Sequence, residues 1–171
     1  MTKKQRPDSS SGQNQKPKLR KYICESDRPL LATTRMPVEV ADYLIARSHE
    51  RGGPYRTTRA LADILTKAFL NERPWNNWST SDFVKSSASK NYEVDRPKAE
   101  AFVQFNLFVP ADTKLNLEKL AREIGVSLAS LLLTAVFWWI FREGHAAQRD
   151  PEILNLIESF WRYPELAAHS Q

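Results

Sequence analysis

The sequence predicts a mostly α-helical protein with one two-stranded antiparallel β-ribbon, a single-chain pseudo-dimer built from two similar halves. The first observation is the stretch AFVQFNLFVP at residues 101–110, where polar and apolar side chains alternate as in a half-buried strand. The second is a recurrence of strand, proline, helix, glycine, polar cap and helix, with 15 residues from Pro37 to Gly52 and from Pro110 to Gly125. The third is size: 171 residues with 42% hydrophobic content suit one compact domain, or two small ones, with tails.

Composition divides the chain into five segments. Residues 1–28 form an arm with eight basic and three acidic side chains, whereas the rest holds 17 of each sign, so the arm accounts for the whole net charge of +5. Because it is poor in apolar groups, we expect the arm to be disordered when free. The two repeats, 29–72 and 101–144, are expected to form one domain. A linker at 73–100 joins them, and a tail with a short amphipathic helix follows at 145–171.

The first repeat starts with the short extended run LLATTRMP, which ends at Pro37. The helix after it should end at Gly52 and Gly53. Its expected inner face consists of Val40, Tyr43, Leu44 and Ser48. Thr57 or Thr58 can cap a second helix. The apolar stripe expected on that second helix consists of Leu61, Ile64, Leu65, Ala68 and Phe69.

The second repeat continues from its strand into a helix that Gly125 should close. The apolar face of that helix is expected to hold Leu117, Leu120, Ala121 and Ile124. Ser127 can cap a last helix that stops at Gly144. Because residues 131–141 are apolar nearly all round, we expect them to be buried in the core, with support of a further interface as the alternative.

The strand of the second repeat needs a partner, because an isolated strand leaves its backbone groups unpaired. We expect LLATTRM to pair with VQFNLFV in antiparallel fashion. The side chains predicted to face inward are Ala32, Thr34, Met36, Phe105, Leu107 and Val109. Those predicted to face outward are Leu31, Thr33, Arg35, Gln104, Asn106 and Phe108. A shift of one residue in register would exchange the two sets.

The linker is polar but carries aromatic residues, namely Trp75, Trp78, Phe83 and Tyr92. We expect the tryptophans to anchor it on the body, with stacking on nucleic acid as the alternative. In the tail, Asp150 as cap and Pro151 at the first helical position start a short helix. Its apolar face consists of Ile153, Leu154, Ile157, Phe160 and Trp161. This face should pack on the bundle; the alternative is a docking surface for a partner protein.

Several classes of function lack support in the sequence. His49, His145 and His169 are scattered, with no cysteine at ligand spacing, so we expect no metal and no cofactor. None of the five glycines forms a phosphate-binding loop, and nothing indicates an enzyme. The single Cys24 rules out an internal disulfide framework and suits a reducing compartment. The chain shows no signal peptide and no apolar run of membrane-spanning length, so we expect a cytoplasmic bacterial protein.

The run QFNLFVP, followed by a helix, Gly125 and a Ser-capped helix, resembles the ribbon-helix-helix DNA-binding family, the superfamily of the Arc, MetJ and CopG repressors. The resemblance covers about residues 29–72 and 101–144; QFNL is a close match to the family's strand and LLATTRMP a loose one. The tandem arrangement is similar to that of TraY-type conjugation proteins and of overdrive-binding virulence proteins of T-DNA transfer. The resemblance implies that the ribbon enters the major groove of double-stranded DNA.

Carried over by position, the resemblance implies base-reading roles on the outward row of the ribbon. These residues are Leu31, Thr33 and Arg35 in the first repeat and Gln104, Asn106 and Phe108 in the second. Leu31 and Phe108 depart from the family's polar residues, although either can touch a thymine methyl. The resemblance also implies phosphate contacts at the start of each second helix. The residues there are Thr57, Thr58, Arg59, Ser127 and Leu128. Capping explains Thr57 and Ser127 equally well.

Three functions follow as hypotheses. The first is an accessory factor of conjugative or T-DNA transfer that binds near the origin of transfer or border and helps a relaxase assemble. The outward side chains of the two strands differ, which suits a DNA site without two-fold symmetry. Such a site would be read by one monomer or by molecules bound side by side. The second is a transcriptional repressor, with an autoregulatory repressor that binds its own promoter as one form of it. The third is a protein-interaction module without DNA binding.

Overall fold

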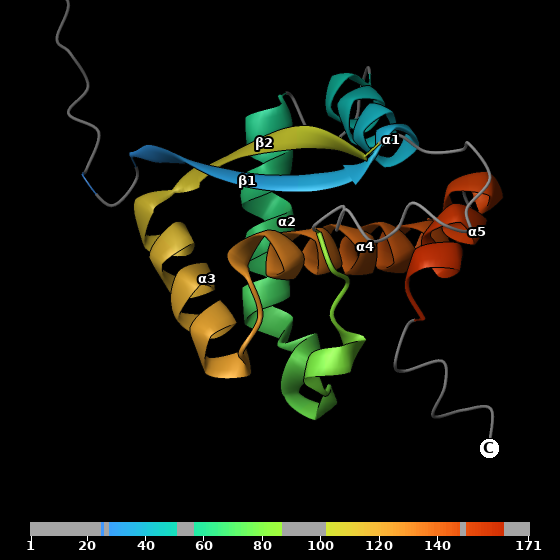
Figure 1. Cartoon of the computed structure of the whole chain (residues 1–171). Coiled ribbons are helices and arrows are strands. Elements are labelled where there is room, and N and C mark those ends of the chain that lie inside the picture. Colours follow the sequence, from blue (N-terminus) through green and yellow to red (C-terminus); the bar gives the residue numbers. More distant parts are fainter. Residues whose placement is uncertain (1–24, 26–27, 51–56, 87–101, 148–149, 163–171) are drawn as a thin grey trace, which may run out of the picture.

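The computed structural model describes residues 25, 28–50, 57–86, 102–147 and 150–162. The elements in these ranges are β1 (Pro29–Pro37), α1 (Val38–His49), α2 (Thr58–Glu72), the 3₁₀ turns η2 (Pro74–Asn77) and η3 (Thr80–Asp82), β2 (Phe102–Pro110), α3 (Ala111–Ile124), α4 (Leu128–Ala147) and α5 (Pro151–Phe160). The order strand, helix, helix occurs twice (Figure 1). The mostly helical fold with a two-stranded antiparallel ribbon is therefore confirmed. The basic arm up to Cys24, Gly52, Gly53 and Tyr92 lie outside the described residues.

The ribbon has the antiparallel pairing and the inward and outward faces that the alternation predicts. β1 and β2 are antiparallel, and Thr33 lies opposite Asn106. Because successive side chains of a strand point to opposite faces, this register sends one set into the core. The buried set consists of Ala32, Thr34, Met36, Phe105, Leu107 and Val109. Each strand ends in a paired proline, Pro37 in β1 and Pro110 in β2, and a helix begins at the next residue. In Figure 1 the strands run above α4.

Helix α4 crosses beneath the ribbon and contacts β1 (Figure 1). All side chains from Leu131 to Phe141 are buried, which confirms their predicted place in the core. Thr134 is the polar member of this run; its hydroxyl donates to the Ser130 carbonyl at 2.8 Å and accepts from the Val84 amide at 2.9 Å. Among the described helices none is by itself long and apolar enough to span a bilayer; α3 and α4 meet that criterion only as a pair, bent by 104° at their junction.

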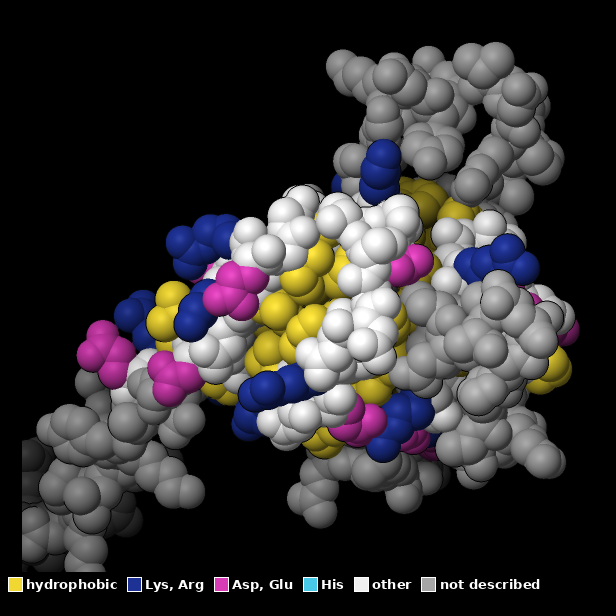
Figure 2. Space-filling model, turned by 90° about the horizontal axis from the view of Figure 1, so that it is seen from below, with side chains coloured by type: hydrophobic (Ala, Val, Ile, Leu, Met, Phe, Trp, Pro, Cys, Tyr) yellow, Lys and Arg dark blue, Asp and Glu magenta, His cyan; other side chains and the backbone are white. Residues whose placement is uncertain are grey.

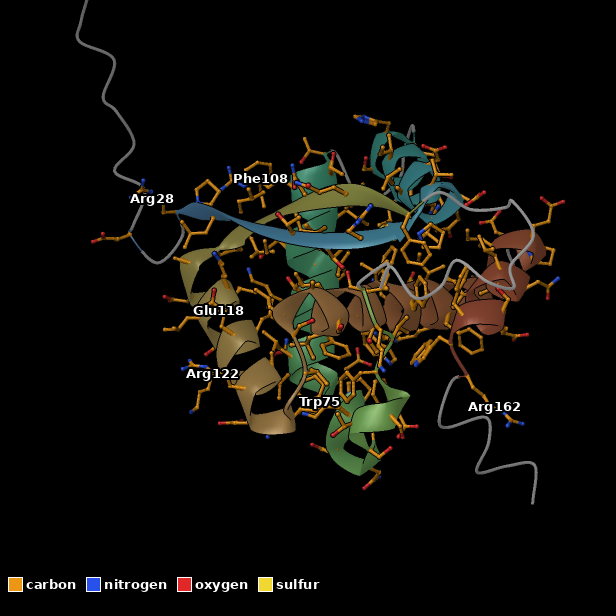
Figure 3. The ribbon with its side chains drawn as sticks, in the orientation of Figure 1. Arg28, Trp75, Phe108, Glu118, Arg122 and Arg162 are labelled. Carbon is orange, nitrogen blue, oxygen red and sulfur yellow. The ribbon has the colours of Figure 1, made fainter. Side chains whose placement is uncertain are left out.

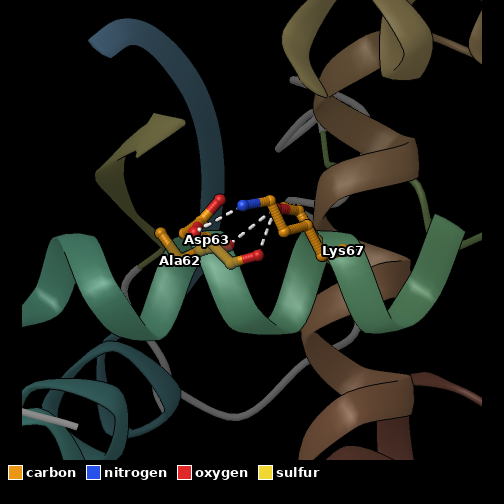
Figure 4. Close-up of polar contacts among 4 residues, drawn as sticks. Ala62, Asp63 and Lys67 are labelled. Atoms are coloured by element: carbon orange, nitrogen blue, oxygen red, sulfur yellow. Dashed lines mark hydrogen bonds and ion pairs between the residues drawn. The ribbon is translucent and has the colours of Figure 1, made fainter. Parts of the chain in front are cut away.

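The buried face of α2 is rotated from the predicted one. Ile64 is exposed, whereas Ala62 and Thr66 are buried beside Leu61, Leu65 and Phe69. The hydroxyl of Thr66 donates to the Ala62 carbonyl at 2.7 Å, so this polar side chain can enter the core with its proton satisfied. Next to it, Asp63 and Lys67 form an ion pair at 2.9 Å (Figure 4). Small residues let α2 approach its neighbours along this face. The prediction used the large apolar residues of the helix and therefore missed Ala62 and Thr66.

Two helix ends differ from the prediction. Helix α1 ends at His49, before Gly52, because Glu50 already takes an extended conformation and its carboxylate pairs with Arg47. Helix α4 continues past Gly144 to Ala147. A glycine inside a helix costs only about 1 kcal/mol, less than the packing of the preceding turns contributes. Gly125, by contrast, ends α3 as predicted, in the left-handed conformation (φ 83°) with its N–H bonded to the Ala121 carbonyl.

The first part of the linker belongs to the core, although its composition predicts otherwise. Phe83, Val84 and Ser86 are buried. The two tryptophans act as packing anchors, as expected: the rings of Trp75 and Phe69 are 4.6 Å apart between centroids, and Trp78 meets Phe83 edge to face at 5.6 Å. Figure 3 shows Trp75 at the lower end of the molecule, far from the ribbon.

Helix α5 packs on the bundle, which confirms the prediction. The alternative was a free docking surface. Ile153, Ile157 and Trp161 are buried, and Trp161 Nε1 donates to the Asp82 carbonyl at 2.7 Å. Asp150 precedes the helix but its side chain does not cap it. Instead its carboxylate acts on the phenol of Tyr43 on α1. Burial of the phenol, followed by the charge and hydrogen bond of Asp150, raises the Tyr43 pKa to about 12.

Candidate functional site

The outer face of the ribbon brings together the six side chains predicted to share it. In the observed register Leu31 lies opposite Phe108 and Arg35 opposite Gln104, with Thr33 and Asn106 between them. Thr33 is half-buried and the other five are exposed. Phe108 extends from β2 on the side of the ribbon that faces away from α4 (Figure 3). We call these six residues the outer row. It contains one basic side chain and no acidic one.

The polar members of the outer row are joined by hydrogen bonds. Asn106 Oδ1 accepts from Thr33 Oγ1 and from Gln104 Nε2, each at 3.2 Å. An amide pairs with the edge of adenine through one acceptor and one donor. To make that bidentate contact, Asn106 must therefore give up at least one of its bonds within the row. Arg35 Nη2 donates to the Phe102 carbonyl at 3.2 Å, and a guanidinium has four further N–H donors.

Ser86 supports the row from the free edge of β1. Its Oγ accepts from the Arg35 amide at 2.9 Å and lies 3.2 Å from the Arg35 carbonyl and 2.9 Å from Thr34 Oγ1. Thr34 uses its own proton on the Ala129 carbonyl at 2.7 Å, so the Ser86 proton goes either to Thr34 or to Arg35. Ser86 is 2% exposed. The backbone at Arg35 is thus held by the linker as well as by β2.

The same hydroxyl chain reaches the start of α4. The Ser86 amide donates to Ser130 Oγ at 3.2 Å, and Ser130 Oγ accepts from Ser127 Oγ at 2.9 Å. Strand β1, the linker and the first turn of α4 are therefore one hydrogen-bonded unit. Sequence reasoning missed Ser86. A serine in a polar linker carries no periodic or spacing signal that would single it out.

The residues expected at phosphates lie at the starts of α2 and α4, and those helices contact β2 and β1 respectively. Thr57 Oγ1 accepts from the Ala60 amide and Ser127 Oγ from the Ser130 amide, both at 3.1 Å. Both hydroxyls therefore act as helix caps. The first amides of a helix have no partner within it, and they are the groups left to meet an anion. Arg59 is exposed, whereas Thr58 and Leu128 are half-buried.

The side opposite the ribbon has a different character. Figure 2 shows hydrophobic side chains near the centre of that face, with basic and acidic side chains interspersed around its rim. Helix α3 contributes ion pairs of Lys114 with Glu118 and of Lys119 with Glu123, at 3.6 and 3.9 Å. Mixed charge of this kind does not attract a polyanion. Within the described ranges, no group of three His, Cys, Asp or Glu side chains is arranged to hold a metal ion.

Comparison with protein-family models, with curated proteins and with solved structures finds no significant match to this chain.

Proposed function

We propose that this protein binds double-stranded DNA by placing the outer row of the ribbon in the major groove. The observation that carries the proposal is the row itself: amide and guanidinium side chains stand side by side on an exposed two-stranded ribbon whose other face is anchored in the core. A groove about 12 Å wide admits such a ribbon. Arg35 would pair with guanine, and Gln104 and Asn106 with adenine, each pair discriminating by about 1–3 kcal/mol.

The backbone contacts would come from the helix starts. The first amides of α2 and α4, supported by the helix dipoles, would each hold a phosphate on one side of the ribbon. The basic arm would add contacts that do not depend on sequence and that weaken as salt rises. In this proposal the chain is a single-chain pseudo-dimer of ribbon-helix-helix type, and it acts as a monomer or as molecules bound side by side.

The unlike halves of the row favour an accessory role in DNA transfer. A symmetric dimer reads a palindrome, whereas Leu31, Thr33 and Arg35 on one strand and Gln104, Asn106 and Phe108 on the other would read a directional site. A directional site suits an origin of transfer or a border, where a relaxase cuts one strand. A repressor could use the same ribbon, and a site over a promoter would identify it.

A protein-interaction module is the second candidate, and one observation favours it. Leu31 and Phe108 are 45% and 47% exposed on the ribbon, in the place where polar base-reading side chains are expected. An apolar pair of this kind can also contact another protein. In that case alanine at the polar positions of the row would leave binding to the partner intact.

Footprinting on natural DNA tests the proposal. The purified chain is mixed with fragments that tile its own genetic neighbourhood, at moderate salt and with excess nonspecific competitor, and retained fragments are footprinted. A protected site without two-fold symmetry beside a nick sequence supports the transfer role, and a site over a promoter supports repression. If no fragment is retained, the proposal of specific DNA binding is wrong.

A matched pair of arginine variants tests the role of the ribbon. Arg35→Ala and Arg122→Ala remove the same charge from exposed positions, but Arg122 lies on α3 and points away from the ribbon (Figure 3). We expect Arg35→Ala to weaken binding of the footprinted site by about tenfold or more, the loss of one bidentate base contact. Arg122→Ala should bind like the wild type. If both variants lose the same affinity, Arg35 contributes through overall charge and not through a base contact.

A further inference from the structure

One end of the outer row is apolar on both strands. Leu31 and Phe108 are direct partners across the ribbon and are 45% and 47% exposed. The other exposed large hydrophobic side chains of the described residues are Ile45, Ile64 and Leu115, and each lies on a different helix. On the ribbon, therefore, the apolar pair belongs to the same surface as the polar row, two residues along each strand from Thr33 and Asn106.

We propose that Leu31 and Phe108 recognise the 5-methyl groups of thymine at one end of the DNA site. The inference rests on the proposed function. Side chains without donors or acceptors cannot pair with the polar base edges, and the methyl group of thymine is the apolar feature that a base presents in the major groove. Because the pair continues the polar row, a ribbon that places Asn106 on a base edge also brings Phe108 into the groove.

The ribbon geometry also sets the spacing of the site. From Leu31 to Arg35 the strand advances about 13 Å, at roughly 3.3 Å per residue. Stacked base pairs are about 3.4 Å apart, so the two ends of the row are separated by about four base pairs at most. The site should therefore have thymine at one end and a guanine about three to four base pairs away, at the Arg35 end.

Replacing thymine with uracil tests the inference, because it removes the methyl group and leaves the pairing unchanged. A pool of duplexes with a randomised centre is selected with the full chain, and the enriched duplex is resynthesised with uracil at one thymine at a time. We expect uracil at the apolar end to weaken binding about three- to fivefold, the contribution of one buried methyl group. Uracil outside the site should have no effect.

A double-mutant cycle assigns the effect to the residues. Phe108→Ala and Leu31→Ala should bind the thymine duplex more weakly and lose most of their response to uracil, whereas Leu115→Ala, at a position 59% exposed on α3, should respond like the wild type. Thermal unfolding of each variant verifies that it is folded. The uracil effect is also measured on the wild type, so that result does not depend on the folding of any variant.

The outcomes separate the inference from the proposed function. If the enriched duplex loses affinity with Arg35→Ala but tolerates uracil at every position, the methyl inference is wrong and DNA binding stands. The inference is equally wrong if Phe108→Ala and Leu31→Ala respond to uracil as strongly as the wild type. If the pool yields no enriched sequence, both fail together.

Discussion

At the scale of the residue, Asn106 shows how the side chains of the outer row hold one another in place. Its Oδ1 accepts from Thr33 and Gln104, so three side chains of the ribbon are joined in one arrangement. Such bonds reduce the rotamer freedom that binding would otherwise have to remove. In the proposed complex with DNA they would have to be exchanged for bonds to a base, which would lower the net gain of each contact.

Tyr43 gives a prediction at the same scale. Its pKa is raised to about 12 in the folded protein, first by burial and then by Asp150, and the ordinary value is 10.0. Between these values the unfolded chain has released the phenol proton while the folded protein still holds it, so the stability that Tyr43 contributes is present below pH 10 and is lost as pH rises toward 12. Urea unfolding from pH 8 to 11.5 should therefore show Tyr43→Phe losing less stability than the wild type. Parallel curves would contradict the raised pKa of Tyr43.

At the scale of the element, the linker acts as a brace for β1. Ser86 fills the strand's free edge at Arg35 and connects it to the first turn of α4 through Ser130. We expect Ser86→Ala to lower the free energy of unfolding by about 1–3 kcal/mol, because it leaves buried backbone groups without a partner. Urea denaturation measures this loss.

Ser159→Ala is the matched control for that prediction. Ser159 is exposed and donates only to the Leu156 carbonyl of its own helix. Its replacement should change stability by less than about 0.5 kcal/mol. If both serine variants lose the same stability, the linker is not a brace for the ribbon.

The elements differ in how far the sequence predicts them. The inward and outward faces of the ribbon follow from the alternation before Pro110, because the opposite facing would bury the amides and expose Phe105 and Leu107. The face of α2 does not follow, because Ala62 and Thr66 give no strong apolar signal. The place of Ser86 depends on tertiary contacts, which no local pattern encodes. The residues of the outer row are thus predictable as a group, while their support is not.

At the scale of the whole molecule, the two strand-helix-helix units share one core but present unlike side chains. Helix α4 is buried along Leu131–Phe141, and its first turn is tied to β1 through Ala129. The body outside the basic arm has no net charge, so specific DNA binding would depend on where its side chains lie. The central claim is therefore that the outer row supplies specificity and that the basic arm supplies general attraction.

Fluorescence anisotropy with two duplexes tests that claim most directly. The wild type and the double variant Gln104→Ala/Asn106→Ala are titrated, at one salt concentration, against the selected duplex and against a scrambled duplex of the same composition. We predict that the double variant binds the selected duplex about thirtyfold or more weakly, the loss of two base contacts, and the scrambled duplex as the wild type does. Unchanged affinity for the selected duplex would contradict the account.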